Sequence, residues 1–457
     1  MRPGLGRPAL ADLRATARLA GPIVLVQVGL MAMGVVDTIM VGHLSPAALA
    51  AVALGNVYFN GPTIFGQGVL LALDPVVAQA VGARDHEAVA RALQRAVVAA
   101  LGITLLVAAC FLPAGAVLAW LRQPRDVAPT AGAYVLASIP GLLPFFGFIV
   151  LRQTLQAMHR TAPIVVAIVG ANLVNAGLNW VLIFGHLGAP RLGPVGSAWS
   201  STIARWVMFA VLLALGWRSY RPNLAPVRPG VLARAPLARL LVLGLPIGAT
   251  MLLEYGAFAA IALLMGLLGT LPMAGHTIAL NLASFTFMVP LGVSSAAAVL
   301  VGRGIGRGDP GAARRAAASA LTLGVGFMAG AAALFLAAPR ALAALYTDQP
   351  AVLALATSLI PIAGVFQVFD GLQVVSAGIL RGVGDTRAPL VVNLVGFWAI
   401  GLPVSIALGF GTPAGPKGLW WGLVAGLAAV GSVLLVRVRH RLRGELRRVL
   451  IDHEPAV

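Results

Sequence analysis

LAGPIVLVQVGLMAMGVVDTIMVG, Leu19–Gly42, is a long apolar run whose only charged side chain is Asp37. About 20 mostly apolar residues are enough for a helix to cross a lipid bilayer. An unpaired charge inside such a helix is costly, or it changes its protonation state. The stretch therefore predicts a membrane-spanning helix with one buried acid. The partners or the function of this acid must be sought in the rest of the chain.

The composition extends this prediction to the whole chain. Of 457 residues, 59% are hydrophobic and only 10% are charged, whereas soluble domains carry about 25% charged residues. This predicts an all-α polytopic membrane protein. The net charge of +18 would suggest nucleic acid in a soluble protein, but the arginines lie between apolar runs, so we expect no nucleic-acid partner. The single cysteine, Cys110, allows no internal disulfide and fits no metal motif.

Hydropathy predicts twelve spans. Their expected ranges are 19–41, 53–77, 96–119, 131–150, 163–184, 194–217, 240–266, 276–300, 316–338, 352–378, 389–410 and 416–436. With the N-terminus inside, the cytoplasmic segments hold 26 Lys and Arg, and the outer loops, counted together with Lys417 at the outer end of the last span, hold 5. Cytoplasmic loops of membrane proteins are enriched in these residues. Both termini are therefore predicted to be cytoplasmic.

The two halves of the chain repeat each other. VGARDHEAVARA from Val81 parallels IGRGDPGAARRA from Ile305, and GPVGSAW from Gly193 parallels GPKGLWW from Gly415. Parallel repeats of this kind are typical of transporters, with the substrate path between the halves. The predicted organisation is an N-terminal lobe at 1–217, a cytoplasmic linker at 218–239, a C-terminal lobe at 240–436 and a basic tail at 437–457.

Three acids fall well inside predicted spans: Asp37, Glu254 and Asp370. An ionisable residue at such a depth is a functional hypothesis by default. The repeat places Ile261 opposite Asp37 and Leu30 opposite Glu254, so the scaffold can be built without these charges. Asp74 precedes Pro75 and is predicted to be a helix-end residue instead.

Polar side chains of two other spans are candidate partners for Asp37. Asn172, Asn175 and Asn179 share one helix face, and span six adds Ser200, Ser201 and Thr202. One carboxylate with several neutral oxygens suits a hard monovalent cation such as Na⁺, and the same carboxylate suits a proton. Interhelical hydrogen bonding without transport chemistry is the alternative interpretation. Arg205, the one basic residue deep in a predicted span, is given no role.

Aromatic side chains in the spans are mostly expected to pack, and a few could stack on a flat organic cation. The predicted substrate-binding residues are the acids Asp37, Glu254 and Asp370 together with Phe369, Phe287 and Asn281. The chain has no GxxxxGK[ST], HExxH or GxSxG pattern. We therefore expect neither an enzyme nor a cofactor.

Three stretches carry a family resemblance. FDGLQVVSAGILRGVGDTRAP, Phe369–Pro389, resembles a long motif of the multidrug and toxic compound extrusion (MATE) family, in its bacterial NorM-like branch. IALNLASFTFMVPLGVSSAAAVLVGRGIGRGD from Ile278 and LDPVVAQAVGARD from Leu73 resemble the same branch. The resemblance implies two six-helix lobes forming a V-shaped cleft, and cation-coupled export of organic cations.

The resemblance also implies residue roles. Asp37 stands where such proteins keep the acid of a first-lobe cation site, and Asn175 and Asn179 resemble its partners. Ser201 stands where a threonine is usual, a departure that keeps the hydroxyl. Glu254 and Asp370 match the second-lobe acids. These six are the predicted cation-coupling residues, and Na⁺ is predicted at Asp37, Asn175, Asn179 and Ser201.

The predicted function is a multidrug efflux antiporter. It would export cationic or amphiphilic compounds in exchange for Na⁺ or H⁺ by alternating access, as a monomer in a bacterial inner membrane. A lipid-linked oligosaccharide flippase of related architecture is the alternative, but its anionic cargo would call for basic cavity residues. An intramembrane enzyme would need a paired nucleophile and base, and no such pair is evident.

Overall fold

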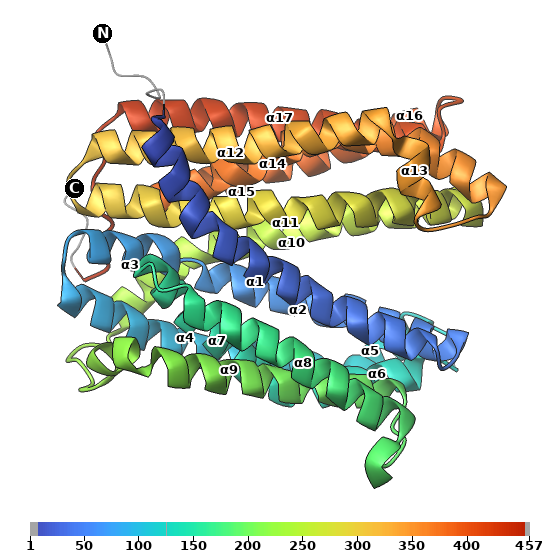
Figure 1. Cartoon of the computed structure of the whole chain (residues 1–457), viewed down its shortest axis with the longest axis horizontal. Helices are drawn as coiled ribbons and strands as arrows, with labels where there is room; N and C mark the ends of the chain where they lie inside the picture. The colour runs from blue at the N-terminus through green and yellow to red at the C-terminus, as the bar shows by residue number, and fades with distance from the viewer. Residues whose placement is uncertain (1–7, 125, 453–457) are drawn as a thin grey trace. The chain divides into compact units, whose positions relative to one another are not determined.

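Helices make up nearly all of the chain (Figure 1). The computed structural model describes residues 8–124 and 126–452, which contain no β-strand. The helices are α1 (Leu10–Gly42), α2 (Pro46–Leu70), α3 (Leu73–Gly82), α4 (His86–Phe111), α5 (Ala114–Trp120), α6 (Ala128–Ser138), α7 (Leu142–Ala157), α8 (Ala162–Phe184), α9 (Pro194–Leu224), α10 (Arg234–Leu268), α11 (Thr270–Gly306), α12 (Pro310–Ala337), α13 (Pro339–Ala344), α14 (Pro350–Val383), α15 (Arg387–Asn393), α16 (Leu402–Phe410) and α17 (Pro416–Arg443). A π-helical segment, Leu394–Gly401, joins α15 to α16.

The prediction of twelve spans is confirmed. Twelve helical segments in the described residues are long and apolar enough to cross a membrane, counting α2 with α3, α6 with α7, and α15 with α16. One predicted boundary is wrong: the span expected at 96–119 ends at Phe111. Pro113 follows, and the apolar residues beyond it form the separate short helix α5. Proline lacks a backbone N–H and cannot continue the hydrogen-bond ladder of a helix.

The sequence repeat is also a structural repeat. Asp85 caps α4 by accepting from the Ala88 N–H at 3.0 Å, and Asp309 caps α12 by accepting from the Ala312 N–H at 2.8 Å. These two acids stand 224 residues apart, like the matched stretches around them. A carboxylate at this position satisfies one of the otherwise unpaired N–H groups of the first helical turn.

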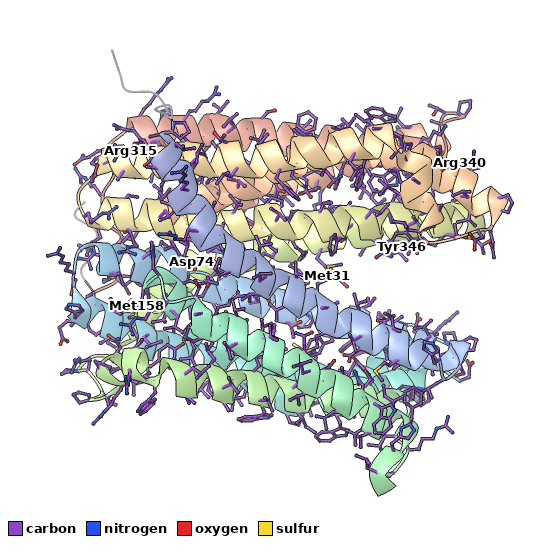
Figure 2. The ribbon with its side chains drawn as sticks, viewed as in Figure 1. Met31, Asp74, Met158, Arg315, Arg340 and Tyr346 are labelled. Carbon is purple, nitrogen blue, oxygen red and sulfur yellow. The ribbon has the colours of Figure 1, made fainter. Side chains whose placement is uncertain are left out.

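The chain divides into two compact units, each described here by itself. Unit 1 contains the chain up to Val24, Gly82–Arg84 and Ala249–Leu450. Within it α11, α12, α14 and α17 pack side by side (Figure 1). Arg315 of α12 lies at one end of unit 1, while Arg340 and Tyr346, which follow that helix, lie at the other end (Figure 2).

Unit 2 contains Leu25–Val81, Asp85–Gly248 and the chain from Ile451 onward. Its core is formed by α2, α4, α6, α7, α8 and α9. The division falls within α1 after Val24 and within α10 after Gly248. These positions are again 224 residues apart. The first part of α1 belongs to unit 1 and its remainder to unit 2, whereas the first part of α10 belongs to unit 2 and its remainder to unit 1.

Buried side chains agree with this division of α1. Leu19, Ala20 and Ile23 belong to the apolar core of unit 1, whereas Val26 and Met33 belong to that of unit 2. On α10, Gly248 lies against the backbone of Phe65 within unit 2, where a Cβ would be crowded. Small residues at such positions allow helix backbones to approach closely.

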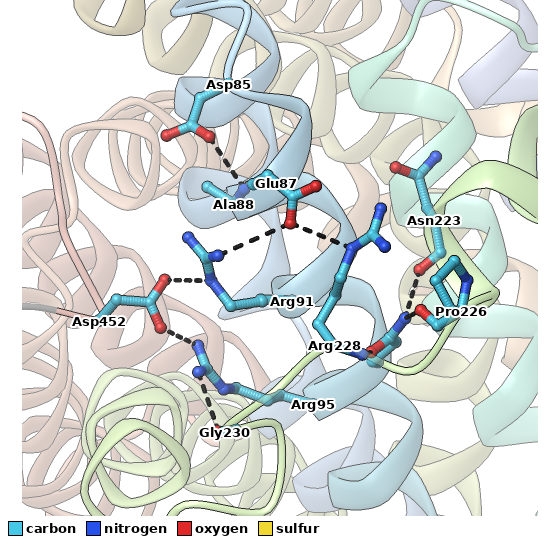
Figure 3. Close-up of polar contacts among 11 residues, drawn as sticks. Asp85, Glu87, Ala88, Arg91, Arg95, Asn223, Pro226, Arg228, Gly230 and Asp452 are labelled. Atoms are coloured by element: carbon cyan, nitrogen blue, oxygen red, sulfur yellow. Dashed lines mark hydrogen bonds and ion pairs between the residues drawn. The ribbon is translucent and has the colours of Figure 1, made fainter.

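A cluster of charged residues holds Asp452, the last described residue, within unit 2 (Figure 3). We call Glu87, Arg91, Arg95, Arg228 and Asp452 the tail cluster. Arg91 Nε and Arg95 Nη1 lie 2.8 and 2.5 Å from the two carboxylate oxygens of Asp452. Glu87 pairs with Arg228 at 3.0 Å. Arg95 also donates to the Gly230 carbonyl at 3.2 Å, so the cluster joins α4, the α9–α10 connection and the tail.

Candidate cation and substrate sites

Asp37 is almost completely buried in unit 2, at 4% exposure, and both of its carboxylate oxygens are hydrogen-bonded. Asn175 and Asn179 donate to Oδ1 at 3.1 and 2.6 Å, and the Ser201 hydroxyl donates to Oδ2 at 2.5 Å. The structure thus brings together the four residues predicted for the first cation site. They come from three helices, α1, α8 and α9.

The helix geometry explains which polar residues reach Asp37. Asn175 and Asn179 are four residues apart on α8 and therefore share a face. Asn172, grouped with them in the sequence, donates to the Gly29 and Ile168 carbonyls instead. On α9, Ser200 donates to the Gly196 carbonyl and Thr202 to the Ala137 carbonyl, which leaves Ser201 as the hydroxyl directed at the acid.

The site suits a negatively charged oxygen with neutral partners. Three donors satisfy the carboxylate, and none of them carries a charge; among the described residues no basic nitrogen forms an ion pair with Asp37. The Asn179 Oδ1 atom is buried without a hydrogen-bond partner in the part of the chain that the structure describes. A small cation could therefore take oxygen ligands from the carboxylate and this amide. Groups of three or more His, Cys, Asp or Glu that could hold a metal do not occur among the described residues.

Arg205 lies one helical turn beyond Ser201 on α9. Its guanidinium carbon is 4.5 Å from the centre of the Phe59 ring and 5.6 Å from that of Phe145. It is close enough to Asp37 for the two charges to act on each other through space. The sequence had identified its depth but had assigned it no function.

The acids of unit 1 form a second polar site. Gln373 Nε2 donates to Glu254 Oε2 at 3.2 Å and to Asn393 Oδ1 at 3.3 Å. Asp370, one helical turn before Gln373 on α14, interacts electrostatically with Glu254. Its Oδ1 is buried with no hydrogen-bond partner among the described residues. The sequence analysis missed Asn393, a fully buried amide; its place inside the eleventh span was the available signal.

Among the described residues, no contact joins Phe287, Phe369 and Asn281, the other predicted substrate-binding residues of unit 1, into one site. Phe287 and Phe369 are partly buried and pack against the unit 1 core. Asn281 is exposed. A different aromatic group lies inside unit 1: Phe366 packs on Trp420 at 5.5 Å, and the buried His276 ring lies 5.6 Å from the same tryptophan.

A second buried cation of unit 2, Arg152, lies two residues beyond the span predicted at 131–150. In the structure Arg152 is part of α7, is 4% exposed and donates to Gln27 Oε1 at 3.1 Å. This partner, Gln27, lies inside the first predicted span, 19–41.

Twelve candidate spanning helices in two repeats, with buried acids in each repeat, define a membrane transport protein. The chain belongs to the MatE family: the family model matches residues 22–181 and again 246–407, once in each repeat. The chain is thus an integral membrane protein of the MATE transporters.

Named bacterial relatives cover nearly the whole chain. The chain is 38% identical to the probable multidrug resistance protein NorM of Mesorhizobium japonicum, over 94% of both chains. It is 38% identical to the multidrug resistance protein PmpM of Pseudomonas aeruginosa, over 97% of this chain and 94% of the relative. Identity to the multidrug resistance protein MdtK of Edwardsiella ictaluri is 33%, over 94% and 95%. These relatives support the NorM-like branch.

Solved structures share the fold. The eukaryotic MATE transporter AtDTX14 superposes with a TM-score of 0.86 at 24% identity, over 95% of this chain and 98% of that one. An outward-facing multidrug resistance MATE transporter of the MOP superfamily superposes with a TM-score of 0.84 at 20% identity, over 96% of each chain.

Proposed function

We propose that this protein is a multidrug efflux antiporter that exports cationic or amphiphilic organic compounds in exchange for Na⁺ or H⁺. The observation that carries the proposal is the buried Asp37 carboxylate with only neutral donors around it. Such a group attracts one positive charge at a time, from a coupling ion or from an organic cation. The multidrug resistance relatives support the class of cargo.

The proposed mechanism is competition for negative charge. A Na⁺ ion or a proton that reaches Asp37 neutralises the carboxylate and weakens its attraction for an organic cation. Glu254 and Asp370 offer a second place for the same exchange in unit 1. A ligand shifts a conformational equilibrium only through different affinities for the two states, and a change in the charge of a buried acid alters such affinities directly. The result is alternating access driven by the ion.

The organisation belongs to the same proposal. Residues 1–217 and 240–436 form the two functional lobes, and 218–239 and 437–457 are the linker and the basic tail. Both termini face the cytoplasm of a bacterial cell, and the transporter works as a monomer in the inner membrane. The charge distribution supports this orientation.

A flippase for lipid-linked oligosaccharides is less well supported. Its cargo carries phosphate and would bind to cationic side chains. The polar sites of both units are instead built around acids and amides, and the one cation beside Asp37 is covered by two aromatic rings.

Dye efflux from proteoliposomes tests the proposal. Purified wild-type protein is expected to export a cationic dye when a Na⁺ or an H⁺ gradient is imposed, with each gradient applied separately. Asp37→Asn keeps the shape of the side chain and removes its ionisable group, so it should fold and lose ion-driven exchange. Asp37→Glu should retain partial activity at best, since one methylene shifts the oxygens by about 1.5 Å. Wild-type exchange rates in purified Asp37→Asn would refute the proposed role.

A further inference from the structure

Arg205 is a charged side chain in the interior of unit 2 that the proposed exchange does not use. Its guanidinium stacks on Phe59 of α2 and Phe145 of α7. Its Nη1 atom is buried with no hydrogen-bond partner among the described residues. Aromatic faces offset part of the cost of burying a cation, but an arginine at this depth in a membrane helix still requires a compensating negative charge.

The geometry identifies Asp37 as that charge. Ser201 and Arg205 are four residues apart on α9, so they lie on the same face, separated by about 6 Å along the helix axis. The Ser201 hydroxyl is 2.5 Å from Asp37 Oδ2. Among the described residues no hydrogen bond or ion pair joins the two charged groups, and the carboxylate keeps its neutral donors. The positive charge of Arg205 therefore acts on Asp37 through space.

In the part of the chain that the structure describes, the other groups around Asp37 supply no competing charge. Helix α8 contributes the amides of Asn175 and Asn179. Helix α6 contributes Tyr134, whose hydroxyl donates to Asn56 Oδ1 at 3.0 Å and is thereby engaged elsewhere. Arg205 is therefore the charged partner of Asp37 in its surroundings.

We propose that Arg205 is a resident counter-cation of Asp37 that sets how tightly the carboxylate holds the coupling ion. This inference rests on the proposed ion exchange at Asp37. When no ion is bound, the arginine stabilises the ionised carboxylate. When an ion arrives, it neutralises Asp37 and leaves the buried guanidinium without compensation. The loaded state is thereby weakened, which favours release of the ion and keeps the exchange reversible.

Arg205→Gln tests the inference through the dependence of transport on ion concentration. The variant lacks the positive charge, so Asp37 should hold the coupling ion more tightly. A unit charge about 10 Å away at an effective dielectric constant of about 20 corresponds to a change of roughly tenfold. The half-maximal Na⁺ or H⁺ concentration for dye efflux should fall by about that factor. Arg205→Lys keeps the charge and should stay within about threefold of the wild type.

Arg152→Gln is the matched control. Arg152 is also buried in unit 2 and lies 5.9 Å from an aromatic ring, that of Phe148, but it is not among the groups that interact electrostatically with Asp37. Its loss should leave the half-maximal ion concentration unchanged. A purely structural role of Arg205 would alter the yield or melting temperature of the variant without moving this midpoint.

The outcomes separate the two proposals. If the wild type shows no ion-driven efflux, the proposed function itself is wrong. If the wild type exchanges ions and folded Arg205→Gln has the wild-type midpoint, the inference about Arg205 is wrong. If Arg205→Gln does not fold, Arg205→Met takes its place: it keeps an unbranched stem against the two aromatic rings, lacks the charge and should lower the midpoint by a similar factor. An unchanged midpoint in folded Arg205→Met would then overturn the inference.

Discussion

At the scale of single residues, the two acid sites are built differently. Both oxygens of Asp37 accept hydrogen bonds. In unit 1, Glu254 accepts from Gln373, and Asp370 leaves Oδ1 without a partner among the described residues. In unit 2, therefore, both oxygens of the acid have a hydrogen-bond donor. In unit 1, at least one oxygen of the two acids has no donor among the described residues.

Neutralising either acid of unit 1 should impair export. Glu254→Gln and Asp370→Asn keep the size of the side chain but remove a charge that an organic cation or a coupling ion would neutralise. We expect at least a several-fold loss of dye efflux in cells that express the variants at wild-type levels. The control is Asp348→Asn, because Asp348 is an exposed acid of the α13–α14 connection. Unimpaired resistance to cationic dyes in both variants would contradict the prediction.

The residues of the Asp37 site could be selected from the sequence, but their contacts could not. Depth in an apolar run is visible in a single sequence, and it identified Asp37 and six candidate partners. The family resemblance then selected Asn175, Asn179 and Ser201 among those six. The rotation of one helix against another is not visible, because it depends on how the side chains of both helices pack. That rotation separates Asn172 from its neighbours on α8 and gives Arg152 a partner on α1.

At the scale of elements, glycine contacts determine how closely the helices of unit 1 pack. A Cβ on Gly422 of α17 would overlap the backbone of Ser405 on α16, and a Cβ on Gly378 of α14 would overlap that of Ser294 on α11. Helix association in membranes depends on such close van der Waals packing. The α14–α11 and α17–α16 pairs therefore have little tolerance for larger residues.

Gly422→Ala should destabilise the protein, because the added methyl group forces two backbones apart. Overpacking of this kind costs about 1–3 kcal/mol, which a lower melting temperature in detergent would report. Gly326→Ala is the matched control, since a Cβ there meets no atom within 4 Å and alanine favours the helix by up to about 1 kcal/mol. Equal melting temperatures for the two variants would contradict this account of the packing.

The tail cluster should hold the segment around Asp452 in a pH-dependent way. Burial raises the pKa of Asp452, but its hydrogen bonds and ion pairs with Arg91 and Arg95 outweigh burial and leave the pKa below the usual value. Because the pKa of Asp452 is lower in the folded state, its ionised form stabilises the fold fully at pH values above the unfolded pKa of about 3.9. This stabilisation is lost as the pH falls through the folded pKa.

Hydrogen exchange of the amides around residues 449–452 measures this contact. Asp452→Asn should speed exchange at pH 7, and the difference from the wild type should shrink as the pH falls below about 4, once intrinsic exchange rates are corrected. Glu445→Gln is the control, because the Glu445–Arg447 pair is exposed and exposed pairs contribute little. A difference that persists unchanged at low pH would contradict the ion-pair explanation.

Hydropathy predicted which segments cross the membrane but not how their helices are interrupted. The chain leaves regular helix at Leu71 and Ala72, between α2 and α3, and it forms a π-helical turn at Leu394–Gly401. A proline follows each interruption within a few residues, Pro75 in the first turn of α3 and Pro403 in the first turn of α16. A proline cannot donate the backbone hydrogen bond that would continue the helix through the break. Hydropathy does not distinguish such a proline from Pro361, which lies inside the continuous helix α14.

At the scale of the whole molecule, the repeat of 224 residues recurs in several independent features. It relates the N-caps Asp85 and Asp309 and the two starts of the family match at residues 22 and 246. The acids do not follow it, since the positions that correspond to Asp37 and Glu254 carry Ile261 and Leu30. A duplicated scaffold thus carries a different polar site in each copy.

Labelling of single cysteines should report the proposed orientation. In a Cys110→Ser background, Leu187→Cys and Leu345→Cys should react with a membrane-impermeant maleimide applied to whole cells, because both positions are strongly exposed and belong to predicted outer loops. Leu232→Cys, equally exposed in the α9–α10 connection, should react only after the membrane is opened. The reverse pattern would overturn the orientation.

The division of α1 and α10 between the two units has a consequence for biosynthesis. When a ribosome has released the first repeat into the membrane, unit 2 still lacks Arg234–Gly248, which fills the space beside Phe65 and Val69. Domains usually fold as units in the order of their synthesis. The core of unit 2 is instead complete only after the beginning of the second repeat has been synthesised. The earliest helix meanwhile carries Leu19 and Ile23 unburied until unit 1 is made. Assembly of this chain is therefore completed late, because the core of each unit includes a helix segment from the other repeat.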